Sequence, residues 1–194
     1  MSYSRTALLV IDVQQSFEHR PYWNPADAPE FLDRLQFLVD GAKARQIPVA
    51  QIFHVEESGA FSLESGYVKT MASLSIAPDV AFYKQRHSAL IGSGLPVWLT
   101  EQGIQHLIVS GIRTEQCCET TTRHASDCGY SVDFVSEATL TFGMTDRIGR
   151  HWPATDIKAR TELVLDGRFA RVLTAGEALS AFDKQRSEAG RQAA

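Results

Sequence analysis

The chain has 194 residues, of which 44% are hydrophobic and 22% are charged, and its formal net charge is −4. This length fits one ordinary domain, or at most two small ones, and buries enough surface to need no disulfide or metal for stability. An excess of Asp and Glu (23) over Lys and Arg (19) argues against a general nucleic-acid binder. No apolar run approaches the ~18 residues of a membrane span, and no signal peptide is recognisable, so we expect a cytoplasmic protein.

Short β-rich runs alternate with helical patterns along the chain, which is typical of βαβ units and a parallel sheet. The predicted strands are 7–12, 47–55, 80–84, 106–111, 131–136 and 169–173. The predicted helices are 31–42, 95–103, 115–128 and 157–165, followed by a last helix that begins with the capping box Thr174-Ala175-Gly176-Glu177. Residues 56–78 are predicted to form a long loop, which in a compact domain is often functional.

The chain contains no internal repeat and no linker-like break. We therefore expect a single domain over residues 1–183 and a frayed polar tail over residues 184–194.

Three chemically active residues fall at the carboxyl ends of predicted strands. Asp12 ends the first strand, Lys84 ends the third, and Cys117 lies just past the fourth. Ligands of open parallel sheets bind at this edge, so we expect the three side chains to lie close together. Each alone has an ordinary interpretation, as a turn former, a solvated lysine or a packed cysteine. Their predicted position at one edge of the sheet favours a catalytic site.

Cys117 follows the segment Ser110-Gly111-Ile112-Arg113-Thr114-Glu115-Gln116. If Thr114 caps the next helix, Cys117 falls at its third position, where free N–H groups and the helix dipole should lower the thiol pKa. A nearby Lys84 ammonium would favour the thiolate further, and Asp12 could accept the thiol proton. The same N–H groups could hold the oxyanion of a tetrahedral intermediate. This arrangement predicts acyl-transfer chemistry.

The other two cysteines are interpreted as structural. Cys118 lies about 100° around the predicted helix from Cys117, and Cys128 lies roughly 16 Å along its axis, which is too far for a disulfide. The spacing matches no CxxC metal or redox motif. Both are therefore expected to pack as small apolar side chains.

Three segments resemble, in order and spacing, the motifs of the isochorismatase-like cysteine hydrolases. They are Leu9-Val10-Ile11-Asp12-Val13-Gln14-Gln15-Ser16-Phe17, Tyr83-Lys84-Gln85-Arg86-His87-Ser88-Ala89 and Gly111-Ile112-Arg113-Thr114-Glu115-Gln116-Cys117. The second motif usually continues with an aromatic residue, where this chain has Leu90. The resemblance extends from about residue 5 to residue 180. The family includes nicotinamidases, carbamoylsarcosine amidases, ureidoacrylate amidohydrolases and the isochorismatases themselves.

The resemblance implies a three-layer α/β/α sandwich around a six-stranded, mostly parallel, Rossmann-like sheet, usually in a homodimer or homotetramer. It also implies a catalytic triad of Asp12, Lys84 and Cys117 that works without a cofactor. Family members have a cis peptide that would lie here between Ile112 and Arg113. Their oxyanion hole would be formed here by the backbone N–H groups of Arg113 and Cys117.

One departure from the family pattern concerns metal. Metal-binding nicotinamidases use a cluster of Asp and His after the second strand, where this chain has Ile52-Phe53-His54 and no Asp. A metal site needs three or more well-placed ligands, so we predict none. His54 is then interpreted as a packing or pocket-lining residue.

A second group of residues concerns the substrate. Arg113 is bulkier than the small residue common at its position, and solvent exposure is slightly favoured over a bidentate grip on a substrate carboxylate. Phe17, Tyr22 and Trp23 follow Asp12 in the loop after the first strand. They either anchor that loop or form an aromatic wall of the substrate pocket.

Cys117 favours an amidase over an isochorismatase, because true isochorismatases lack this cysteine and hydrolyse a vinyl ether by acid catalysis. We therefore expect hydrolysis of the C–N bond of a small amide, carbamoyl or ureido compound through a thioester intermediate. The alternatives are a vinyl-ether hydrolase of the isochorismatase type and a non-catalytic flavodoxin-like binding module. The specific substrate is not predicted.

Overall fold

The structure, a computed structural model, describes residues 5–192. Six strands form one sheet in the order β3-β2-β1-β4-β5-β8, and every pairing in it is parallel. These strands are β1 (Thr6–Ile11), β2 (Val49–His54), β3 (Val80–Lys84), β4 (His106–Ile112), β5 (Ser131–Leu140) and β8 (Arg171–Leu173). β6 (Met144–Thr145) and β7 (His151–Trp152) form a separate antiparallel ribbon. The predicted α/β fold with a six-stranded sheet is confirmed.

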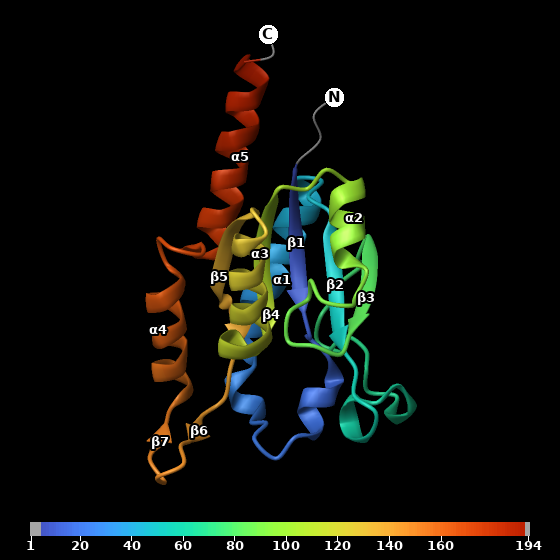
Figure 1. Ribbon diagram of the computed structural model, residues 1–194, viewed down its shortest axis with the longest axis vertical. Helices are drawn as coiled ribbons and strands as arrows, with labels where there is room; N and C mark the ends of the chain where they lie inside the picture. The colour runs from blue at the N-terminus through green and yellow to red at the C-terminus, as the bar shows by residue number, and fades with distance from the viewer. Residues whose placement is uncertain (1–4, 193–194) are drawn as a thin grey trace.

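Helices cover both faces of the sheet (Figure 1). α1 (Pro29–Ala44) and α5 (Ala175–Gln192) pack on one face, while α2 (Leu95–Glu101), α3 (Glu119–Asp127) and α4 (Ala154–Leu165) pack on the other. Within residues 5–192, no helix combines the length and the apolar character that crossing a bilayer requires.

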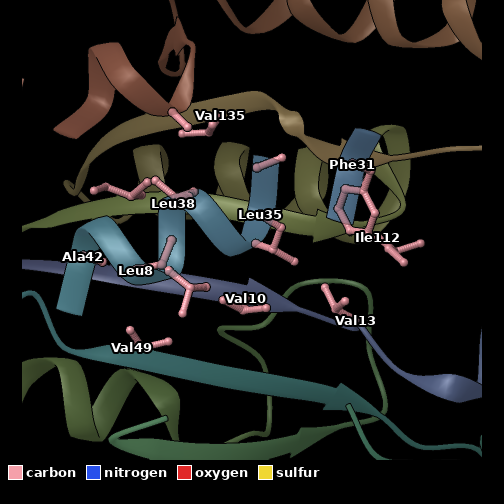
Figure 2. Packing of buried hydrophobic residues seen from close by; sticks show 14 of the residues in the cluster. Leu8, Val10, Val13, Phe31, Leu35, Leu38, Ala42, Val49, Ile112 and Val135 are labelled. Carbon is pink, nitrogen blue, oxygen red and sulfur yellow. The ribbon is translucent and has the colours of Figure 1, made fainter. Parts of the chain in front are cut away.

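The central strand β1 accounts for this layering. All six of its residues are buried, and a strand buried on both faces reads as a continuous apolar run. Leu8 and Val10 face the core beneath α1 and α5, and Figure 2 shows both on the side of β1 where α1 lies. Leu9 and Ile11 point the other way, into the core beneath α2, α3 and α4.

The C-terminal helix differs from the prediction at its end. The expected capping box is confirmed, because Thr174 N–H donates to Glu177 Oε2 (2.8 Å) and Glu177 N–H donates to Thr174 Oγ1 (3.2 Å). Residues 184–192, expected to be frayed, continue α5. Their Ala, Glu, Gln, Lys and Arg residues favour helix, and the helix is already nucleated by its docked first turns. Residues 193 and 194 lie outside the described part.

The carboxyl ends of the strands converge on one edge of the sheet, where the loops of residues 13–28 and 56–78 lie (Figure 1). The long loop contains two short 3-10 turns, η3 (Gly59–Phe61) and η4 (Leu63–Ser65). It fastens to the chain after β1 through backbone hydrogen bonds from Gln15 to Lys69 (2.9 Å) and from Ser16 to Tyr67 (3.1 Å). Two hydrogen-bonded segments, residues 13–28 and 56–78, therefore lie at this edge of the sheet.

The neighbouring strands β1 and β4 approach unusually closely at this edge. Gly111 has a φ of +126°, and a Cβ there would lie 2.0 Å from the carbonyl oxygen of Ile11. Only glycine fits such a position. The strand order reverses between β1 and β4, so this pair forms the switch point at which open α/β sheets bind ligands.

Candidate active site

The fold brings Asp12, Lys84 and Cys117 together beside the switch point. Asp12 follows β1 directly and has a φ of +54°, in the left-handed region that Asp tolerates better than most residues. Lys84 ends β3, two strands away, and its side chain reaches back to Asp12. Lys84 Nζ lies 2.7 Å from Asp12 Oδ2 and 3.4 Å from Cys117 Sγ. Asp12 and Lys84 are each 1% exposed and Cys117 is 7% exposed.

The helix that carries Cys117 begins differently from the prediction. It opens with a π-helical turn, η5 (Thr114–Cys118), for which Arg113 occupies the N-cap position without a side-chain cap. The prediction that Thr114 caps the helix is wrong, because its hydroxyl donates to Thr139 Oγ1 on β5 (2.8 Å). Cys117 is therefore the fourth residue of the helical segment and still lies in its first turn. The peptide bond between Ile112 and Arg113 is cis.

The electrostatics of the thiol also differ from the prediction. Burial and the Asp12 carboxylate raise the pKa of the Cys117 thiol, and they outweigh the lowering effect of Lys84. The expected lowering of this pKa is therefore wrong, because desolvation of the buried thiol and the Asp12 charge raise its pKa more than Lys84 lowers it. At rest the sulfur keeps its proton, next to a carboxylate.

The Asp12 carboxyl contacts Lys84 and interacts with the Cys117 thiol. Burial raises the pKa of its carboxyl above the ordinary value, although the contact with Lys84 opposes this. Its Oδ2 accepts from Lys84, whereas its Oδ1 is buried and receives no N–H or O–H donor from the described residues. The Cys117 thiol interacts with the same carboxyl. Burial lowers the pKa of Lys84, but Asp12 and Cys117 together raise it above the ordinary value, so the ammonium stays charged.

Two histidines flank the three residues. His54 Nδ1 lies 3.3 Å from Lys84 Nζ, and His87 Nδ1 lies 3.8 Å from Cys117 Sγ. The sequence predicts His54 to be a packing or pocket-lining residue and does not single out His87 as a site residue. The available signal for His87 was its place three residues after Lys84 within the second motif.

The three aromatic candidates join one aromatic cluster, which consists of Phe17, Tyr22, Trp23, Phe61 and Phe142. Phe17 in η1 (Gln15–His19) contacts Phe61 edge-on, with ring centroids 5.0 Å apart. Phe142 contacts Phe17, Tyr22 and Trp23 with centroid separations of 6.1, 4.9 and 5.8 Å. Phe61 also packs against the ring of His54. The cluster therefore extends from the neighbourhood of Lys84 to Arg113.

The Arg113 side chain is buried in this cluster. It is 11% exposed, its Nε lies 3.1 Å from Glu115 Oε1, and its guanidinium carbon lies 5.2 Å from the Tyr22 ring centroid and 5.5 Å from that of Phe142. The slightly favoured expectation of solvent exposure is wrong, because cation–π contacts and an ion pair hold the guanidinium inside. Within residues 5–192, Arg113 Nη2 is buried without a hydrogen-bond partner.

The two remaining cysteines differ in their surroundings. Cys118 is fully buried, as expected. Cys128 is exposed, so its interpretation as a packed residue is wrong. It occupies the C-cap position of α3, where the helix ends at the surface.

The last residues of β2 do not fit a metal ion. Ile52, at the place of the acidic ligand of metal-binding nicotinamidases, is fully buried in the apolar core. His54 directs Nδ1 at the Lys84 ammonium, a position that repels a second cation. Over residues 5–192, no group of three or more His, Cys, Asp or Glu side chains is arranged to hold a metal.

Comparison with known proteins places these features in a family. The Isochorismatase domain matches residues 6–148. The chain belongs to the isochorismatase family of hydrolases. It is 24% identical over 183 residues to the uncharacterized isochorismatase family protein YrdC of Bacillus subtilis, covering 93% of this chain and 97% of the relative.

Two further comparisons agree with this membership. The chain is 28% identical over 152 residues to Nicotinamidase 3 of Arabidopsis thaliana, covering 70% of this chain and 73% of the relative. Its fold matches the crystal structure of an isochorismatase-family protein from Chromobacterium violaceum with a TM-score of 0.84 and 29% identity, covering 94% of this chain and 96% of the other.

Proposed function

We propose that this isochorismatase-family hydrolase is a cysteine hydrolase that cleaves a small amide, carbamoyl or ureido C–N bond through a thioester intermediate. The observation that carries the proposal is the buried Lys84 ammonium, which lies 2.7 Å from Asp12 and 3.4 Å from the Cys117 sulfur. A buried base, a fixed cation and a thiol in mutual contact are the parts that covalent acyl transfer needs. Similarity to an Arabidopsis nicotinamidase, a hydrolase of a small amide by its name, supports this substrate class.

In the first half-reaction, Asp12 takes the thiol proton on its open Oδ1 while the sulfur of Cys117 attacks the carbonyl carbon. The raised pKa of Asp12 suits a group that must hold this proton for part of the cycle. The backbone N–H groups of Arg113 and Cys117, at the start of η5, receive the oxyanion of the tetrahedral intermediate. The C–N bond then breaks, and Asp12 returns the proton to the leaving nitrogen.

In the second half-reaction, Asp12 removes a proton from water, and the resulting hydroxide attacks the thioester carbonyl. The C–S bond breaks, the sulfur regains a proton, and the acid product leaves. Lys84 stays charged throughout and stabilises whichever of its two partners, Asp12 or Cys117, carries the negative charge. Lys84 thus removes the energetic penalty of a bare buried anion.

The first test measures ammonia release by the full chain across a panel of small amides, ureas and carbamoyl compounds. Cys117→Ala should abolish release, and an acyl adduct should be found on Cys117 of the parent protein by mass spectrometry. Cys118→Ala is the matched control, because it removes a neighbouring buried thiol. It should keep activity within roughly tenfold, a barrier change of ~1.4 kcal/mol. Ammonia release by Cys117→Ala, or hydrolysis of a vinyl ether with no amide turnover, would overturn the proposal.

A further inference from the structure

His54 lies beside Lys84 because of the register of two strands. β2 and β3 run parallel, and their pairing sets His54 opposite Lys84, the last residue of each strand. Directly paired residues project to the same face of a sheet, so the two side chains lie next to each other. His54 Nδ1 lies 3.3 Å from Lys84 Nζ.

The direction of this hydrogen bond follows from the chemistry of the two groups. An ammonium has three N–H donors and no acceptor, so Lys84 must donate and Nδ1 must be unprotonated. The other two donors of Lys84 point at Asp12 Oδ2 and Cys117 Sγ. The imidazole proton then sits on Nε2, which lies 3.7 Å from Glu56 Oε1, beyond hydrogen-bond distance. Each of the three Lys84 N–H groups therefore has its own acceptor: a carboxylate oxygen, a sulfur and an imidazole nitrogen.

A buried side chain holds His54 in this place. Gln14, which is fully buried, accepts the backbone N–H of His54 (2.8 Å) on Oε1 and donates from Nε2 to the His54 carbonyl oxygen (3.1 Å). Gln14 Nε2 also donates to Ser16 Oγ (2.8 Å). The chain after β1 therefore fixes the end of β2, and with it the imidazole.

We propose that His54 is a positioning residue that accepts the third N–H of Lys84 and thereby aims the ammonium at Asp12 and Cys117. The role deepens the proposed function, on which its catalytic meaning rests. Burial, Lys84 and His87 lower the pKa of His54 to about 4, so its ring is neutral at neutral pH. A neutral ring is the only form able to accept from an ammonium.

The direct test is the tautomer of His54, measured by ¹⁵N NMR on the histidine-labelled full chain at neutral pH. We expect the proton on Nε2 and a bare Nδ1 whose resonance moves in Lys84→Met, where the donor is lost. His124 supplies an internal comparison, because its Nδ1 contacts Ser88 Oγ and not the lysine. A proton on Nδ1 of His54, or a resonance unaffected by Lys84→Met, would overturn the proposal.

The second test separates hydrogen bonding from packing. His54→Asn keeps an acceptor near the place of Nδ1 but loses the ring, whereas His54→Phe keeps a ring against Phe61 but loses the acceptor. We expect His54→Phe to raise the pH midpoint of Cys117 alkylation by iodoacetamide by about one unit, a tenfold loss of thiolate below the midpoint. His54→Asn should stay near the parent value. The modified cysteine is assigned by tandem mass spectrometry.

Glu56→Gln is the matched control and should leave the midpoint unchanged, because Glu56 does not reach Lys84. Equal shifts in the Asn and Phe variants, or a shift in Glu56→Gln as large as that of His54→Phe, would overturn the proposal. Neither the tautomer nor the alkylation midpoint requires turnover. A failure of amide hydrolysis and a failure of His54 to hold Lys84 are therefore distinguishable.

Discussion

Asp12 and Asp133 are two buried aspartates beside cationic side chains, yet their pKa values move in opposite directions. Asp12 is 1% exposed and Asp133 is 2% exposed. Burial raises the pKa of Asp12 above its ordinary value in spite of Lys84. Burial acts in the same sense on Asp133, but hydrogen bonds from His106 and Arg171 outweigh it and lower the pKa.

The number of donors explains the contrast. Asp133 accepts from His106 Nε2 (2.9 Å) and from Arg171 Nε and Nη2 (2.7 and 2.9 Å), so both of its oxygens are occupied. Among residues 5–192, Lys84 is the one N–H or O–H donor to the Asp12 carboxyl, and it bonds Oδ2 alone. Asp133, with both oxygens bonded, stays ionised. Its hydrogen bonds join β4, β5 and β8 near their amino ends. A carboxylate with one oxygen open can take up a proton, as the proposed reaction requires.

The largest expected effect comes from removing the open carboxylate. Asp12→Asn should lower amide hydrolysis by ~10³-fold or more, because one group performs proton transfer in both half-reactions. The pH midpoint of Cys117 alkylation should fall or stay unchanged, since Asp12 raises the pKa of this thiol. An upward shift of the midpoint would contradict the charge arrangement described for Asp12.

The next largest effect concerns stability. Lys84 lies at the carboxyl edge of the sheet, but its side chain is buried against Asp12. Lys84→Met should lower the free energy of unfolding by ~3 to 4 kcal/mol in urea titrations at neutral pH, because it leaves a buried carboxylate unpaired.

The double variant Asp12→Asn/Lys84→Met is the control for this explanation. Removing both charges should recover much of the lost stability, since a neutral pair carries no uncompensated buried charge. A double variant as unstable as Lys84→Met would mean that packing of the lysine stem, and not its charge, stabilises this edge.

The smallest effect is expected at the fully bonded aspartate. Asp133→Asn should cost about 2 kcal/mol of unfolding free energy at neutral pH, the loss of charge-assisted hydrogen bonds. The folded pKa of Asp133 is depressed, so its contribution is present above the unfolded pKa of about 3.9 and is lost as pH falls through the folded pKa. Parent and variant stabilities should therefore converge below about pH 4. If the unfolding free energies of parent and variant keep a constant difference across the pH range, the Asp133 carboxylate is not the cause of that difference.

Local patterns were enough to predict the sheet and the place of the three reactive residues. The strand 80–84 and the capping box at Thr174 were predicted from runs and short-range spacing, and both are confirmed. Strand ends also indicated Asp12, Lys84 and Cys117, because parallel strands end at one edge.

The features that local patterns did not predict depend on contacts between residues far apart in the chain. The orientation of Arg113 depends on Tyr22 and Phe142, which approach it only in the folded chain. The pKa of Cys117 depends on how deeply the thiol is buried, which no helix pattern reveals. The contact of His54 with Lys84 depends on the register of β2 against β3.

The close approach at Gly111 divides the site into parts that can and cannot vary. Any side chain there would collide with the backbone of β1, and backbone cannot move aside without displacing Asp12, the next residue after Ile11. Gly111 is thus closed to substitution, while exposed positions of the loops of residues 13–28 and 56–78, such as Glu18 and Glu64, meet no such constraint. Substitutions at such positions can change the loop surface while Asp12, Lys84 and Cys117 keep their spacing. We therefore expect variation near the site to accumulate in these loops, with the pairing of β1 and β4 unchanged.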